Sequence, residues 1–136
     1  MGLDMWTILA KKRHENTKAT YEDREKFTAD WNIEDDEHHY WRKNRHLNNW
    51  MAQRYYNLGG TSDDFNCCYL VLTVNILKEL QCDIENSTVE QMGEHGFFWG
   101  EGDYTYKETD LKFCKDAIAE LEELGDDYAI VYTNWW

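Results

Sequence analysis

The chain has 136 residues, a length typical of one domain that can bury a substantial core. Apolar residues make up 42% of it and aromatic residues 15%, which excludes a chain that is disordered as a whole. Its 14 basic and 27 acidic side chains give a formal charge of −13, which disfavours direct binding of nucleic acid, and no apolar run approaches the roughly 20 residues of a membrane span.

The first part of the chain predicts a strand, a long polar segment and a helix. Residues 3–10 are apolar and β-favouring, so we expect an opening strand. Residues 14–37 are mostly polar and charged, and we interpret them as an inserted loop or hairpin. Residues 40–58 place aromatic and apolar side chains at roughly helical spacing and end at Gly59-Gly60, which predicts a helix.

The second part predicts a strand, two helices and a final strand. Residues 68–72 form a short apolar run typical of a buried strand, and the next residue, Thr73, can cap a helix over residues 74–84. Residues 110–124 carry the clearest helical stripe, which ends before a glycine. Residues 128–136 are strongly β-favouring and predict a terminal strand.

The order of these elements predicts a single α+β domain over residues 1–136. We expect a short mixed or antiparallel sheet, about three helices, and terminal strands that are candidates for neighbours in that sheet. The N-terminal residues lack the basic and apolar regions of a secretory signal, which predicts a cytoplasmic protein. The cysteines include no C-x-x-C pair, so we expect reduced thiols and no zinc site at Cys67, Cys68, Cys82 and Cys114.

Residues 35–39, Asp-Asp-Glu-His-His, contain side chains of the kinds that bind metal ions. Neighbours in sequence rarely converge on one ion, however, and no H-E-x-x-H pattern accompanies them. We therefore interpret the segment as solvated charge before a helix, and we predict neither a bound metal nor a cofactor.

A candidate ligand site lies where the first predicted helix begins. Trp41, Arg42, Lys43 and His46, together with Arg45, would place cationic donors beside an aromatic ring. Arginine can bind a phosphate or carboxylate through two parallel hydrogen bonds, and tryptophan can stack on a base. The alternative is that Trp41 belongs to the core and that Arg42 and Lys43 pair with acidic side chains.

The second part of this candidate site is a run of three aromatic residues between two glycines: Gly96, Phe97, Phe98, Trp99 and Gly100. Bracketing glycines indicate a tight turn or a close backbone approach. The rings could line a pocket, anchor a protein partner or plug the end of a sheet, and the terminal pair Trp135-Trp136 could add to any of these.

Signals for catalysis are weak. The glycine-rich residues 59–64 are not followed by the lysine of a phosphate-binding P-loop, and no G-x-S-x-G pattern marks a nucleophile. Asp63, Asp64 and His95 are the only side chains that we would test, and we assign no catalytic residue.

A resemblance is carried by four motifs: MGLDM at 1–5, YWRK at 40–43 followed by Trp50, GFFWG at 96–100, and the aromatic C-terminal strand. With them the chain resembles a family of small bacteriophage and prophage proteins whose function is not settled. Some members are labelled phosphoglycerate kinase, which the short chain and the lack of a nucleotide-phosphate motif do not support. The resemblance spans most of the chain outside residues 14–37 and departs at Asn48, where we expect histidine, which argues against a catalytic role for that helix. It implies a phage accessory protein acting in the cytoplasm of the host bacterium.

The acidic side chains are concentrated in one part of the chain. Residues 1–54 hold ten basic and ten acidic side chains, whereas residues 55–136 hold four basic and seventeen acidic ones, so the second part carries the whole −13. We therefore expect a non-enzymatic protein that binds and inhibits a host factor, such as a defence component, by meeting a basic surface on that partner. Its partner-binding residues would be Glu120, Glu122, Glu123, Asp126 and Asp127, with aromatic anchors.

The alternative is a protein that binds or sequesters a small molecule such as a nucleotide signal. Its pocket would combine Trp41, Arg42, Lys43 and His46 with residues 97–99. The sequence leaves open the identity of the partner, the oligomeric state, and whether the acidity serves only solubility.

Overall fold

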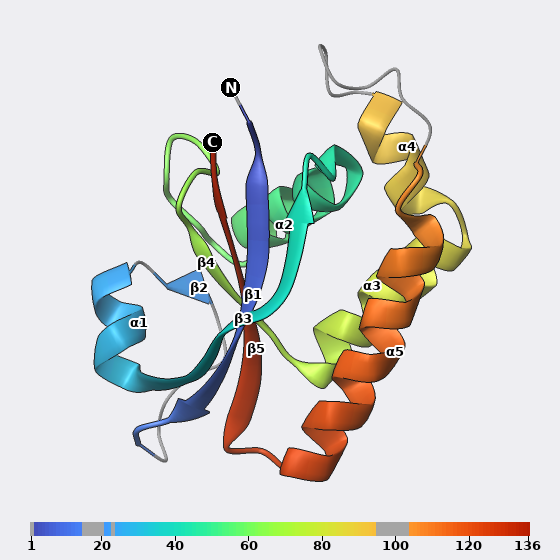
Figure 1. Ribbon diagram of the computed structural model, residues 1–136. Coiled ribbons are helices and arrows are strands. Elements are labelled where there is room, and N and C mark those ends of the chain that lie inside the picture. Colours follow the sequence, from blue (N-terminus) through green and yellow to red (C-terminus); the bar gives the residue numbers. More distant parts are fainter. Residues whose placement is uncertain (1, 15–20, 23, 95–103) are drawn as a thin grey trace.

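The computed structural model describes residues 2–14, 21–22, 24–94 and 104–136, and their centre is one antiparallel sheet (Figure 1). The sheet is five-stranded in the order β2-β4-β5-β1-β3. The expected α+β class is confirmed, with an antiparallel rather than a mixed sheet. The strands are β1 Asp4–Lys12, β2 Tyr21–Glu22, β3 Trp31–Arg42, β4 Tyr69–Leu72 and β5 Tyr128–Trp135.

Three longer helices correspond to the three that the sequence predicts, and two short helices accompany them. The longer ones are α2 Arg45–Asn57, α3 Val74–Glu85 and α5 Lys107–Leu124, and the short ones are α1 Arg24–Asp30 and α4 Thr88–Glu94. Figure 1 shows α1 apart from the other helices, on the far side of the strands. Among the described residues, no helix combines the length and the apolar character that a membrane crossing requires.

The sheet carries a separate apolar cluster on each face because successive strand residues point to opposite sides. On β5, Ile130 and Tyr132 pack into the larger cluster, which is completed by side chains of α2, α3 and α5. Ala129 and Val131 pack into the smaller one, with Phe27 of α1. The alternation explains how one short strand supports both layers.

The two terminal strands lie side by side, as the sequence suggested. β1 pairs with β5 in antiparallel register from Asp4 opposite Trp135 to Lys11 opposite Tyr128. β1 also pairs with β3 along its other edge, so it is flanked on both sides. The beginning of the chain is therefore held next to its end.

Two expectations about the first part of the chain are wrong. An inserted loop or hairpin was expected over residues 14–37, but residues 24–37 form α1 and the first half of β3. The helix expected over residues 40–58 begins only at Arg45, where the Asn44 side chain caps it by accepting a hydrogen bond from the Leu47 N–H. Residues 40–42 belong instead to β3, because they pair with the start of β1.

A buried carboxylate joins β3, the start of α2 and α5. Asp110 of α5 accepts hydrogen bonds from Trp41 Nε1 at 2.8 Å, from Asn44 Nδ2 at 2.8 Å and from the Tyr104 hydroxyl. Burial raises the pKa of Asp110 to about 6, and the three donors act in the opposite direction. Trp41 is thus a core residue with an assigned partner, which matches the structural alternative considered for it.

We predict that the contribution of Asp110 to stability decreases as pH rises. Its folded pKa of about 6 exceeds the ordinary 3.8, so the folded chain holds this proton more tightly than the unfolded chain does. The stabilisation is complete below about pH 4 and is lost as pH passes about 6. Urea unfolding should give a difference between wild type and Asp110→Ala that is larger at about pH 4 than at about pH 7, by up to about 3 kcal/mol.

The exposed Glu122 of the same helix offers the control, because Glu122→Ala removes a carboxylate of the same helix that is not buried. A wild-type advantage over Asp110→Ala that grows with pH would mean that the three donors stabilise an anion strongly enough to reverse the effect of burial.

Candidate functional site

The side chains proposed as one ligand site from the sequence do not lie on one helix turn. Trp41 is buried in the core, whereas Arg42 is exposed at the end of β3 and Lys43 is exposed in the following turn with φ 57°. His46 is buried, and its ring stacks on Tyr104 with centroids 5.0 Å apart. The shared-turn prediction is wrong because β3 continues through Arg42, and residues on a strand alternate between its faces.

The positions of the other candidate residues from the sequence say little about a functional site. Phe97, Phe98, Trp99 and His95 lie outside the described residues. Asp63 and Asp64 are exposed on the loop before β4. All four cysteines are free. None of these positions assembles a site among the residues that can be described.

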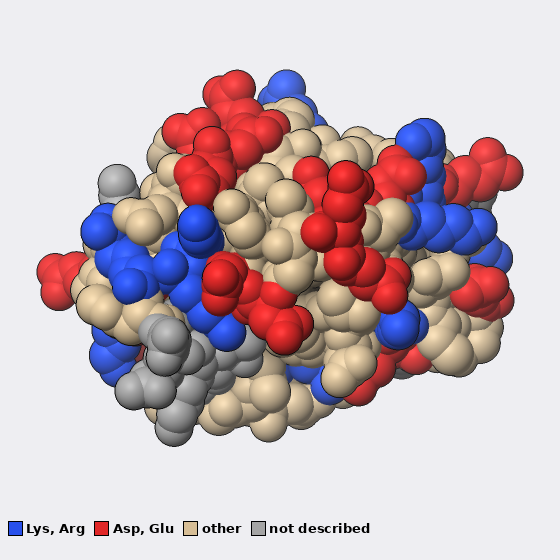
Figure 2. Space-filling model, turned by 90° about the horizontal axis from the view of Figure 1, so that it is seen from below, with Lys and Arg blue, Asp and Glu red and all other residues tan. Residues whose placement is uncertain are grey.

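The acidic residues proposed for partner binding differ in their contacts and exposure. Glu120 Oε1 forms a hydrogen bond with His38 Nε2. Glu122, Glu123, Asp126 and Asp127 are exposed, and no ion pair within the described part of the chain engages them. Figure 2 shows Asp and Glu in several groups separated by Lys, Arg and uncharged surface, so the face seen there is not one continuous acidic patch.

An irregularity in β3 turns two adjacent histidines toward the same helix. Thr7 of β1 pairs with His39 and Leu9 pairs with Asp35, so β3 contains extra residues between these two pairs. The Glu37 N–H donates to Asp35 Oδ1 at 3.0 Å inside this bulge. Bulges interrupt the alternation of side chains along a strand. The segment 35–39 is therefore part of β3 and not the approach to a helix, although Asp35, Asp36 and Glu37 are exposed, as expected of solvated charge.

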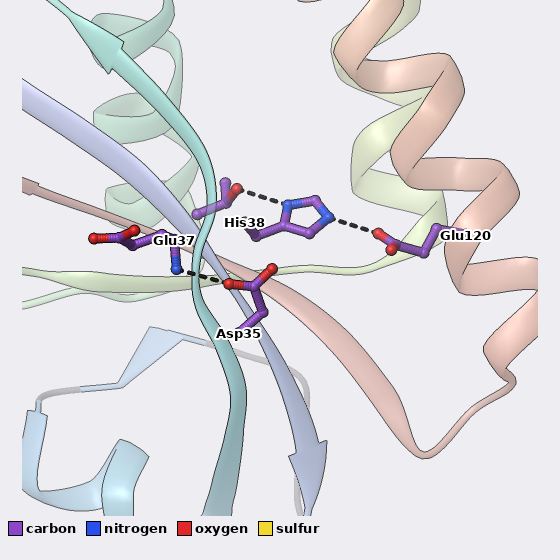
Figure 3. Close-up of polar contacts among 5 residues, drawn as sticks. Asp35, Glu37, His38 and Glu120 are labelled. Carbon is purple, nitrogen blue, oxygen red and sulfur yellow. Dashed lines mark hydrogen bonds and ion pairs between the residues drawn. The ribbon is translucent and has the colours of Figure 1, made fainter.

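Both histidines line a cleft of about 400 Å³ between β3 and α5. His38 Nε2 lies 2.6 Å from Glu120 Oε1, and His38 Nδ1 lies 3.0 Å from Thr7 Oγ1 (Figure 3). Burial lowers the pKa of His39, His38 lowers it further, and Asp116 raises it.

The hydroxyl group that contacts His38 cannot take part in chemistry in this cleft. Thr7 is fully buried, so its Oγ1 orients His38 and cannot meet a substrate as a nucleophile. Across the described residues, no group of three or more His, Cys, Asp or Glu side chains could hold a metal ion. The cleft is thus a structural link between β3 and α5, and its lining includes the carboxylates of Asp116 and Glu120 and the exposed Thr109.

A pocket of different character lies where β1 begins and β5 ends. Its volume is about 520 Å³, and it is lined by Gly2, Leu3, Arg45, Asn48, Asn49, Ala52, Phe65 and Trp136. We call it the Arg45–Trp136 pocket. Antiparallel pairing of β1 with β5 brings two of its walls together, and α2 provides the third.

The aromatic wall of this pocket is held in place by hydrogen bonds. Trp136 Nε1 donates to the Phe65 carbonyl at 2.7 Å. The Trp136 N–H donates to Asn66 Oδ1 at 3.0 Å, and Asn66 Nδ2 donates to the Trp136 carbonyl at 2.8 Å. Trp136 is nevertheless 42% exposed, so an anchored ring remains available for contact.

The polar wall comes from the first turns of α2. Asn48 Oδ1 accepts from the Tyr132 hydroxyl at 2.6 Å and from Asn134 Nδ2 at 2.8 Å, which fixes the amide and leaves its N–H groups as donors. Burial lowers the pKa of Arg45, the first residue of α2. A guanidinium partly removed from water interacts more strongly with an anion, and the helix N-terminus adds to the positive potential.

The sequence identified only some of these residues. Arg45 was grouped with the proposed site, Asn48 was noted where the family resemblance departs, and Trp136 was recorded as part of an aromatic pair. Phe65 and Asn49 were missed. No local pattern marks them, because the pocket combines four segments that are distant in the sequence.

We predict that neutral His38 carries its proton on Nε2. Glu120 as a carboxylate can only accept a hydrogen bond, so Nε2–H must donate to it while Nδ1 accepts from the Thr7 hydroxyl. Long-range ¹H–¹⁵N NMR spectra of the neutral ring should show this tautomer. Thr7→Val should loosen that preference, whereas a predominant Nδ1–H form in the wild type would contradict the arrangement.

Comparisons of the chain with protein-family models, with curated proteins and with solved structures each found no match. The resemblance to small phage proteins stays a prediction. The functional argument therefore depends on the geometry of the Arg45–Trp136 pocket and on the exposed carboxylates.

Proposed function

We propose that this protein is a non-enzymatic binding protein whose Arg45–Trp136 pocket takes a small molecule with a planar ring and an anionic group, as in a nucleotide. The observation that carries the proposal is an exposed tryptophan, held by one hydrogen bond of its ring and two of its main chain, in the same pocket as a partly buried guanidinium. This keeps the small-molecule alternative from the sequence but moves it to different residues.

The size and the lining of the pocket support this ligand class. About 520 Å³ falls within the range of small-molecule sites, which combine apolar walls with a few polar groups. Trp136 offers a face on which a base can stack, and Arg45 offers a partner for phosphate. The amides of Asn48 and Asn49 can hydrogen-bond the edge of a base.

The same lining favours binding over catalysis. None of the described side chains around this pocket carries a carboxylate, imidazole, thiol or hydroxyl group. General acid–base and nucleophilic chemistry need one of these groups within reach of the ligand. If the resemblance to phage proteins holds, sequestering a nucleotide signal of the host bacterium would be the matching role.

We predict that Arg45→Ala weakens nucleotide binding about tenfold, because a charge-assisted hydrogen bond to phosphate is lost. Isothermal titration with a panel of mono- and dinucleotides measures this directly. Lys115→Ala removes one exposed positive charge from α5 and should change the affinity less than twofold. Equal losses in the two variants, or no binding by any nucleotide of the panel, would contradict the proposal.

A second candidate function rests on the exposed carboxylates at the end of α5. Glu122, Glu123, Asp126 and Asp127 lie within six residues of one another, and no ion pair within the described part of the chain neutralises them. Such a group can attract a basic protein surface. This supports the hypothesis that the chain binds and inhibits another protein. That this protein is a factor of a host bacterium, such as a defence component, is a prediction from the resemblance to phage proteins.

For this second candidate we predict salt-sensitive capture of a protein from a bacterial lysate. The complex should form at low salt and be largely lost at roughly 0.5 M salt, where charges are screened within a few ångströms. A variant with Glu122→Gln, Glu123→Gln, Asp126→Asn and Asp127→Asn should lose it as well. The matched control neutralises four exposed acids of β3: Glu34→Gln, Asp35→Asn, Asp36→Asn and Glu37→Gln. Capture that is unaffected by salt, or equally reduced in the control, would exclude this surface.

A further inference from the structure

One end of the sheet presents aromatic rings to solvent. Trp135 of β5 is 62% exposed and Tyr40 of β3 is 57% exposed, which makes them the most exposed large hydrophobic side chains in the described part of the chain. Trp6 of the intervening strand β1 is partly buried. Contiguous exposed apolar surface of this kind is typical of an interaction site, and no function discussed so far uses it.

The strand register places these rings on one face together with two charged side chains. Trp6 lies opposite Tyr40. Asp4, two residues earlier on β1, lies between Trp135 on one side and Arg42 on the other. Residues two apart on a strand point the same way, so all five share a face, and the Tyr40 hydroxyl donates to Asp4 Oδ1 at 2.5 Å. We call these five residues the Trp135–Tyr40 face.

The helix α1 packs on the same side of the sheet but nearer to the other end of the strands. Phe27 of α1 packs with Val131 of β5 and against the ring of Tyr69, with centroids 4.8 Å apart. Val131 and Trp135 are four positions apart on one strand and therefore point to the same side. In Figure 1 both chain ends lie above α1. The Trp135–Tyr40 face thus continues the smaller apolar cluster beyond the helix that covers it.

The charges on this face balance, unlike those of the whole chain. Asp4 and Arg42 contribute one charge of each sign, and no ion pair within the described part of the chain engages either of them. The acidic end of α5 precedes β5, whereas Trp135 ends this eight-residue strand, about 25 Å away. Figure 2 views the molecule from that opposite, acidic end. Charges are screened within about 8 Å at physiological ionic strength, so the net −13 does not decide what this face binds.

We infer that the Trp135–Tyr40 face binds a second copy of the chain in a two-fold dimer. A two-fold axis that runs parallel to the strands, between β1 and β3, places Asp4 of each copy over Arg42 of the other. The same rotation places Trp6 of each copy over Tyr40 of the other. Every contact across such an axis occurs twice. Sheets that pack face to face lie about 10 Å apart, a gap that large side chains fill.

The balanced charges favour this occupant over a strongly charged one. A nucleic acid would place phosphates against Asp4, and a basic protein surface would place its cations against Arg42. In the dimer each of these two charges meets the opposite one. A few aromatic side chains of about 150–250 Å² each fall short of the roughly 800 Å² per partner of a standard interface. The dimer is therefore weak, with a Kd on the order of 100 µM.

The test is sedimentation equilibrium of the full chain between about 10 µM and about 1 mM, a range that brackets this Kd. The wild type should change from monomer to dimer with increasing concentration. Asp4→Arg alone and Arg42→Asp alone should each weaken association at least tenfold, because each places like charges face to face. An equimolar mixture of the two variants should associate again, because each variant then offers the other opposite charges at both contacts.

Uncharged variants keep the inference testable if a charge reversal disturbs the fold, which circular dichroism checks. Tyr40→Ser should weaken association about tenfold through loss of a ring contact. Leu124→Ser removes an exposed apolar side chain from the far end of α5 and should leave association within twofold. A wild type that stays monomeric at about 1 mM, a mixture that associates no better than its components, or equal losses in Tyr40→Ser and Leu124→Ser would overturn the inference. A monomer whose tryptophan fluorescence responds to oligolysine would assign the face to a basic partner and overturn it as well.

This inference does not depend on the proposed nucleotide site. The Arg45–Trp136 pocket is lined by Leu3 and Phe65, which belong to the larger apolar cluster on the other side of the sheet. Sedimentation therefore tests the dimer, and nucleotide titration tests the pocket.

Discussion

The position of β1 in the sheet is the constraint on which the other features depend. Because it pairs with β5 on one edge and β3 on the other, it determines what lies at both ends of the sheet. The Arg45–Trp136 pocket forms at its beginning, and a second cavity, whose lining includes Lys12 and Trp31, forms at its end. The mismatch in its pairing with β3 produces the bulge that turns His38 toward α5.

Electrostatics act locally in this protein, in spite of its large net charge. The Asp110 carboxylate is buried beneath three donors, where loss of water raises its pKa. The four acids at the end of α5 remain in water, whereas Arg45 is partly removed from it. An interaction is strengthened most where water is excluded, so a cation beside a cavity attracts a nearby anion more strongly than the total of −13 suggests.

Sequence patterns predicted most elements but a smaller part of the candidate sites. The stripe of α5, the Thr73 cap of α3 and the β-favouring last residues led to correct elements. The residues from Trp31 to Arg42 were not predicted to form a strand, because they show no alternating pattern. Their strand conformation comes from pairing with β1. Trp41 and Arg42 were therefore assigned to a helix turn, although they lie on opposite faces of a strand.

The sequence by itself determined the class of fold, the existence of most helices and strands, and the concentration of acidic residues after residue 54. These properties depend on composition and on neighbours within about four positions, which a single chain displays directly. Only the tertiary structure decided that Phe65 and Trp136 face Arg45, that Trp31 shares a cavity with the start of α3, and that Glu120 meets His38. Such contacts join residues tens of positions apart, and they follow from strand register and helix packing, which no local pattern specifies.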